Sequence, residues 1–117
     1  MKSESIKSFL NLKNIAVIGV SSKSKGFGVA VYNHLKDNGY NTFGVNKNGG
    51  FSNSIKLYNS LALIDNNIDG VITVVPPSET EIIVQEAKEL GIKHIWMQQG
   101  SESKNAIDFC KQNGISM

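Results

Sequence analysis

A chain of 117 residues with 40% hydrophobic residues is long enough for a single domain over residues 1–117 with one buried core. The net charge of +2 is too small to indicate binding to nucleic acid or to a membrane. The single cysteine excludes an intramolecular disulfide. No apolar run approaches the ~18 residues of a membrane span, and Met1–Asn14 lacks the apolar core of a secretory signal. We therefore expect a cytoplasmic protein.

Apolar runs of strand length alternate with stretches of helical periodicity along the whole chain. In chain order, the expected elements are a short helix over Ser3–Leu12, a strand over Ile15–Val20, a helix over about Gly28–Asn38, a strand over Asn41–Val45, a polar loop over Asn46–Ser54, a short strand over Ile55–Leu57, a small helix that ends near Asn66, a strand over Gly70–Val75, a helix from Ser78 to Gly91, a strand over His94–Met97, a helix that stops at Gly114, and the beginning of one further strand over Ile115–Met117.

Two of the helix starts carry capping signals. Ser78, with Glu81 three residues later, forms a capping-box pattern directly after Pro76 and Pro77, which end the preceding strand. Either Ser101 or Ser103 is expected to cap the last helix, because a serine hydroxyl accepts hydrogen bonds from the first turn.

This alternation of strands and helices predicts an α/β protein. We expect a three-layer α/β/α Rossmann-like fold with a parallel five-stranded sheet, in which Ile15–Val20 is central and Val71–Val75 lies beside it. Ligands of such sheets bind beyond the carboxyl ends of the strands. The segments Val20–Gly28, Val75–Ser78 and Gln98–Gly100 should therefore converge on one crevice.

The stretch Asn14–Gly28 combines features of a phosphate-binding strand, loop and helix. Its glycines let the backbone approach a ligand, the following helix presents unpaired N–H groups, and serine hydroxyls and two lysines add donors for an anion. The spacing is neither G-x-G-x-x-G nor that of a Walker A loop. An ordinary turn with a solvated loop is the alternative, but the expected convergence of three segments favours a nucleotide-phosphate site.

The residues after the second strand narrow the choice of nucleotide. Binding of NAD calls for Asp or Glu at that point, to accept hydrogen bonds from the ribose hydroxyls. This chain has Asn46 and Lys47 there, with no acid nearby. A lysine instead favours an additional phosphate on the ribose, which NADP carries at the 2′ oxygen and coenzyme A at the 3′ oxygen.

The order of the segments IAVIGVSSKSKGFG, VNKNGG, VITVVPPSET and IWMQQGSES resembles that of the small stand-alone CoA-binding proteins. The Rossmann-type domain of that family is similar to the CoA-binding domain of the succinyl-CoA synthetase α subunit. The resemblance covers about Ile6 to Met117, and its most specific parts are Val75-Pro76-Pro77 and Trp96–Gly100. It implies that the chain binds coenzyme A or an acyl-CoA.

The resemblance also assigns parts of the ligand to parts of the chain. It implies that the pyrophosphate is bordered by Gly19, Ser21, Ser22, Lys25 and Gly28, that the adenosine 3′-phosphate is approached by Asn46 and Lys47, and that the path toward the pantetheine is lined by Val75, Pro76, Gln98 and Gly100. Val20 and Pro77 lie within the same segments and complete the candidate set. The family usually has a proline in place of Lys47 and a cysteine-rich turn in the last strand, which this chain lacks.

No pair of residues in the sequence indicates catalysis. His34 is expected on a helix surface, His94 at the sheet end opposite the crevice, and Cys110 in the core, so these residues form neither a catalytic pair nor a metal site. We therefore expect a non-catalytic binding or regulatory module that acts as a homodimer or with a larger acyl-CoA enzyme. The alternatives are an NADP-binding oxidoreductase fragment or subunit, and a scaffold that no longer binds a ligand.

Overall fold

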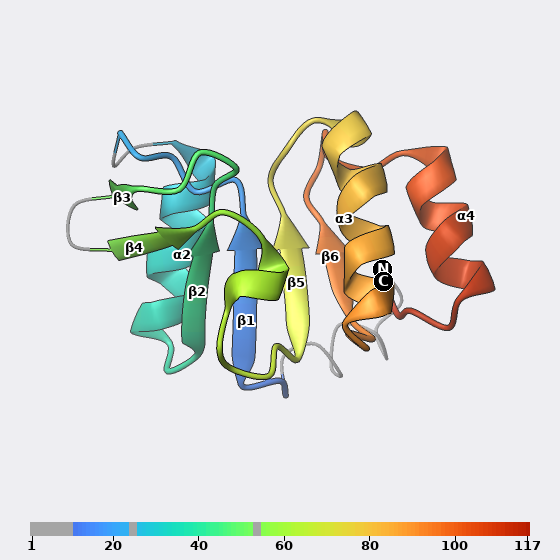
Figure 1. Cartoon of the computed structure of the whole chain (residues 1–117), viewed down its shortest axis with the longest axis horizontal. Helices are drawn as coiled ribbons and strands as arrows, with labels where there is room; N and C mark the ends of the chain where they lie inside the picture. Colours follow the sequence, from blue (N-terminus) through green and yellow to red (C-terminus); the bar gives the residue numbers. More distant parts are fainter. Residues whose placement is uncertain (1–10, 24–25, 53–54) are drawn as a thin grey trace.

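The structure, a computed structural model, describes residues 11–23, 26–52 and 55–117 (Figure 1). Its elements are β1 (Asn14–Ile18), α2 (Phe27–Asp37), β2 (Asn41–Val45), β3 (Phe51–Ser52), β4 (Ile55–Tyr58), the short 3-10 helix η1 (Leu61–Leu63), β5 (Gly70–Thr73), α3 (Pro77–Glu89), β6 (Ile95–Met97) and α4 (Lys104–Gln112). The leading helix expected over Ser3–Leu12 lies almost entirely outside the described residues. None of the described helices is long and apolar enough to cross a bilayer.

The six strands form one sheet in the order β3-β4-β2-β1-β5-β6. The central strand β1 pairs in parallel with β2 and β5, and β6 pairs in parallel with β5, as the sequence predicts. The expectation of five parallel strands is wrong in one respect, because β3 adds a sixth strand that is antiparallel to β4. This strand has two residues and follows Gly49 and Gly50, so it is too short to show a period in the sequence.

Both faces of the sheet are covered, as the three-layer prediction requires (Figure 1). Alternate residues of β1 point to opposite faces. Ala16 and Ile18 pack in a core cluster with Val84 of α3 and Cys110 of α4, whereas Val17 packs with Val29 and Tyr32 of α2. The fold is therefore Rossmann-like. The last residues of the chain extend the sheet beyond β6, because Ser116 forms a parallel bridge with His94.

Of the two predicted helix caps, the structure contradicts that of α3 and confirms that of α4. The capping box at Ser78 is wrong: α3 begins at Pro77, Pro76 takes the N-cap position, and no side chain caps the helix. A proline suits the first turn because its fixed φ matches the helix and its missing N–H would have no partner there. For α4 the cap is Ser103, whose hydroxyl accepts a hydrogen bond of 3.0 Å from the Ala106 N–H.

Two glycines allow three segments to meet backbone to backbone at the carboxyl edge of the sheet. A Cβ atom on Gly28, in the first turn of α2, would collide with the carbonyl oxygen of Gly19. A Cβ atom on Gly19 would in turn collide with the carbonyl oxygen of Val74, and Gly19 has a φ of +110°, which disfavours other residues. The start of α2, the end of β1 and the end of β5 thus depend on these two positions.

A buried hydroxyl network joins the end of β5 to two further segments at the same edge. The Ser101 hydroxyl lies 2.6 Å from Thr73 Oγ1 at the end of β5 and 2.7 Å from Thr80 Oγ1 in α3. These three residues are at most 2% exposed. The Gln98 N–H also donates to the Thr73 carbonyl at 3.1 Å, and the Ser101 N–H donates to the Gln98 carbonyl at 2.8 Å. The turn after β6 is therefore held to β5 and α3.

We predict that Gly28→Ala destabilises the protein by about 1–3 kcal/mol, the usual range for overpacking at a site where the backbone must move. Denaturant unfolding measures the loss. Asn33→Ala is the control, because Asn33 is exposed on the same helix and such a surface change alters stability by at most ~0.5 kcal/mol. An unchanged midpoint for Gly28→Ala would show that α2 does not need this close contact.

We predict that Ser101→Ala costs about 1–3 kcal/mol of stability, because it leaves the buried Thr73 and Thr80 hydroxyls without their shared partner. Thermal or denaturant unfolding measures the loss. The added substitution Thr73→Val should cost less in the Ser101→Ala background than in the wild type, since the contact is already broken. Strictly additive losses would indicate that the three hydroxyls do not act as one network.

Candidate functional site

A cleft of about 700 Å³ lies beyond the carboxyl ends of the central strands. One wall comes from the loops after β1, β2 and β4, and the opposite wall comes from α3. The residues that line it are Ile18, Gly19, Ser21, Val45, Asn46, Lys47, Asn48, Asn59, Ser60, Val75, Glu79, Ile82, Ile83, Glu86 and Glu89. A cleft at this edge of a parallel sheet is the expected ligand site of such folds.

Five of the predicted site residues meet in this cleft, namely Gly19, Ser21, Asn46, Lys47 and Val75. The others lie elsewhere: Val20 and Gly28 are buried in the packing between β1 and α2, Ser22, Pro76, Pro77 and Gly100 are exposed, Gln98 lines a separate groove, and Lys25 is outside the described residues. Gly28 is thus explained by close helix packing, and its contact with a ligand stays a prediction.

The start of α2 is suited to an anion. Gly26 occupies the N-cap position at a φ of +112°, no side chain caps the helix, and no acidic residue lies in its first turn. The N–H groups of a first helical turn have no partner within the helix, and the helix dipole places partial positive charge there. The start of α2 therefore offers donors that no acidic side chain in its first turn neutralises.

The start of α3 lies at the same edge of the sheet, but it carries an acidic residue in its first turn and is less suited to an anion. Pro77 has no N–H, and the Glu79 N–H donates to the Pro76 carbonyl at 2.9 Å, which leaves the Ser78 N–H as the backbone donor of this turn. The carboxylate of Glu79 lies in this first turn and offsets the helix dipole. Of the two helix starts, that of α2 is therefore the more favourable for a phosphate.

Asn46 ties two loops of the site together. Its side-chain amide donates to the Val20 carbonyl at 3.0 Å, and its side-chain oxygen accepts from the Asn48 N–H at 2.8 Å. The Asn46 N–H donates to the Tyr58 carbonyl at 2.9 Å. The side chain therefore positions the loop after β1 relative to the loop after β2. The turn formed with Asn48 is a common use of asparagine, but its bond to Val20 could not be read from the sequence.

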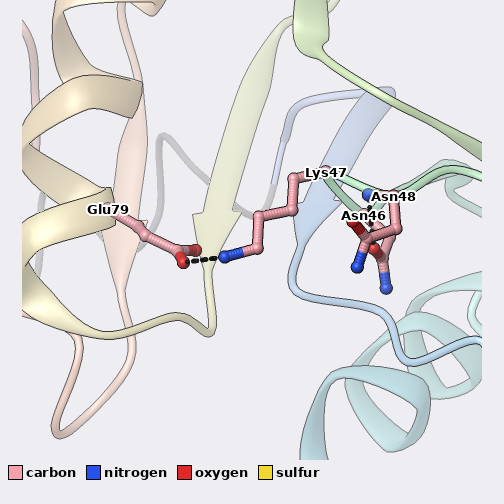
Figure 2. A network of polar contacts seen from close by, with 4 residues as sticks. All are labelled: Asn46, Lys47, Asn48 and Glu79. Atoms are coloured by element: carbon pink, nitrogen blue, oxygen red, sulfur yellow. Dashed lines mark hydrogen bonds and ion pairs between the residues drawn. The ribbon is translucent and has the colours of Figure 1, made fainter.

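Lys47 reaches from the end of β2 to the first turn of α3 (Figure 2). Its Nζ lies 3.1 Å from Glu79 Oε1, and the two side chains are 75% and 36% exposed. The sequence indicated that no acid follows β2, and that is correct locally. The acid comes instead from a helix 32 residues later, which only the fold brings across the cleft.

The α3 wall of the cleft was missed by sequence reasoning. Glu79, Ile82, Ile83 and Glu86 recur at the three- and four-residue spacing that places side chains on one helix face. Ile82 is 67% exposed, which is unusual for an isoleucine and gives the cleft an apolar surface between carboxylates. The spacing alone indicated a helix face, but not that this face borders a ligand cleft.

The residues considered for catalysis lie apart from one another. His34 is exposed on α2, and Cys110 is buried in the core as predicted. Burial raises the pKa of the Cys110 thiol to about 11, so this thiol is protonated at neutral pH. In the described part of the chain, no three metal-binding side chains come together.

A second groove, of about 420 Å³, lies between α2 and the strands β5 and β6. It is mostly apolar and is lined by Phe27, Ala30, Val31, His34, Leu35, Ile72, Trp96 and Gln98. Gln98 therefore sits on the α2 side of the sheet, away from the cleft that holds Lys47. The predicted path from Val75 to Gln98 would cross the carboxyl edge of β5 and β6.

Comparisons with known proteins agree with this architecture. A solved hypothetical protein from Pyrococcus horikoshii OT3 is 27% identical, with a TM-score of 0.91 over 99% of this chain and 82% of that one. A solved conserved hypothetical protein from Pyrococcus furiosus is 29% identical, with a TM-score of 0.81 over 89% of this chain and 90% of that one.

The curated relatives are subunits of larger enzymes. The α subunit of acetate–CoA ligase [ADP-forming] I from Pyrococcus furiosus is 30% identical over 95 residues, which are 76% of this chain but 21% of that subunit. The chain thus spans about a fifth of that relative's length. The family model of the CoA binding domain matches residues 13–117, so the chain belongs to the CoA binding domain family.

Proposed function

We propose that the chain binds coenzyme A or an acyl-CoA in the cleft between the β2 loop and α3, as a binding or regulatory module without catalysis of its own. The observation that carries the proposal is the cleft itself, where Lys47 and the uncapped start of α2 border the same edge of the sheet. A ribose phosphate and a pyrophosphate each need such a partner. Membership of the CoA binding domain family supports the choice of ligand.

The two helix starts suggest how the ligand is oriented. The pyrophosphate would lie at the start of α2, near Ser21 and Ser22, because α2 has no acidic residue in its first turn whereas α3 has Glu79 there. Lys25, which precedes Gly26 in the sequence, is a further candidate. The adenosine would then enter the cleft, with its 3′-phosphate near Lys47 and its base against the apolar surface of Ile82. The pantetheine would leave past Val75, Pro76 and Pro77 toward Gln98 and Gly100.

The curated relatives bear on the role of the matched segment. Acetate–CoA ligase [ADP-forming] I subunit alpha is about five times as long as the segment matched here. We infer that the matched segment holds the CoA-type nucleotide, and that it acts together with a larger acyl-CoA enzyme or a second copy of the chain.

NADP is the competing ligand, because Lys47 without an adjacent acid also suits a 2′-phosphate. Calorimetric titration with CoA, acetyl-CoA, NADP and NAD distinguishes the two. We expect CoA and acetyl-CoA to bind more tightly than NADP, and NAD to bind most weakly. Tighter binding of NADP than of CoA would overturn the proposal, as would turnover of acyl-CoA by the isolated chain that a single substitution abolishes.

We predict that Lys47→Ala lowers the affinity for CoA about five- to tenfold, because a solvent-screened, charge-assisted hydrogen bond to phosphate contributes ~1–1.4 kcal/mol to binding. Dephospho-CoA should bind the wild type more weakly and lose little more in the variant. Lys36→Ala is the matched control for net charge, since Lys36 lies in the last turn of α2, far from the cleft. Equal losses for CoA and dephospho-CoA would contradict the assignment of the 3′-phosphate to Lys47.

A further inference from the structure

We propose that Glu79 tunes the affinity of the cleft for a ribose phosphate: its carboxylate holds Lys47 until a ligand phosphate takes its place. This inference rests on the proposed binding of CoA and adds a role for a residue on the opposite wall. The contact that carries it is the 3.1 Å ion pair between Lys47 Nζ and Glu79 Oε1 (Figure 2). Both residues line the cleft, so their contact joins its two walls.

The ion pair is of the kind that exchanges readily. Lys47 is 75% exposed and Glu79 36% exposed, and ion pairs in such settings contribute little to stability. Within the described ranges, Glu79 is the carboxylate that pairs with Lys47. A ligand that offers a stronger anion at the same distance can therefore displace Glu79 at small cost.

A ribose phosphate is such an anion, and a ribose hydroxyl is not. A phosphate monoester carries a charge of about −1.5 to −2 at pH 7, against −1 for a carboxylate, and it has three acceptor oxygens. A ligand with unmodified ribose hydroxyls offers Lys47 no charge, so the pair with Glu79 should persist. The competition by Glu79 therefore weakens the binding of ribose-phosphorylated nucleotides and leaves the binding of their dephosphorylated forms nearly unchanged.

The charges on α3 restrict where that phosphate can lie. Glu79, Glu86 and Glu89 all line the α3 wall. In the first turn of α3, Pro77 has no N–H and the Glu79 N–H donates to the Pro76 carbonyl, which leaves the Ser78 N–H as the backbone donor. A phosphate near α3 would meet carboxylates with few compensating donors, so we expect it to lie on the β2 side of Lys47.

The test compares Glu79→Gln with Glu86→Gln by calorimetric titration. Glu86 lies two turns further along α3, lines the same cleft and forms no ion pair in the structure, so its substitution changes the field without freeing Lys47. We expect Glu79→Gln to increase the affinity for CoA about two- to fivefold. The affinity of Glu79→Gln for dephospho-CoA should differ from that of the wild type by less than about twofold. Glu86→Gln should change the affinity for either ligand by less than about twofold. Thermal unfolding confirms that each variant is folded.

The same titrations in the Lys47→Ala background test whether the effect of Glu79 on CoA binding depends on its ion pair with Lys47. Without Lys47, Glu79→Gln should alter CoA affinity no more than Glu86→Gln does. Unchanged or weaker CoA binding by Glu79→Gln would overturn the inference, as would equal gains with and without Lys47. If the wild type binds CoA while Glu79→Gln has no effect, the proposed function stands and only the role of Glu79 fails; no CoA binding by the wild type would refute both.

Discussion

The site depends on a close backbone contact that only glycine permits. Gly28 in α2 packs against the carbonyl of Gly19, and Gly19 packs against the carbonyl of Val74 at the end of β5. Because no side chain separates these segments, the loop after β1 and the start of α2 are fixed at the carboxyl edge of the sheet. The glycines that suggest a phosphate loop in the sequence therefore act in the structure through close packing of the backbone.

Polar contacts of two kinds then shape the cleft. Buried or partly buried bonds hold its framework: Asn46 joins the loops after β1 and β2, and Ser101 joins the turn after β6 to β5 and α3. The contact between Lys47 and Glu79 is exposed and spans the opening instead. This division suits a binding module, because the framework is costly to disturb while the contact across the opening can be exchanged for a ligand.

Most of the fold could be predicted from the sequence, because continuous apolar runs such as Ile15–Val20 specify buried parallel strands. β3 could not, since its two residues are defined only by pairing with β4. The start of α3 was misplaced because Pro76 and Pro77 were interpreted as ending a strand, without their also beginning a helix. Lys47 and Asn46 were found from their place after β2. Glu79 and Ser101 were not, because their partners are 32 and 28 residues away.

We propose that a CoA-type nucleotide lies along the carboxyl edge of the sheet. Amide chemical-shift mapping of the labelled protein during titration with CoA tests this proposal. We expect the largest changes in residues 19–23, 26–29 and 46–48 and in Val75, Ser78 and Glu79, with smaller ones at 98–101 along the pantetheine path. Changes confined to the groove between α2 and Trp96, or no changes at millimolar CoA, would contradict it.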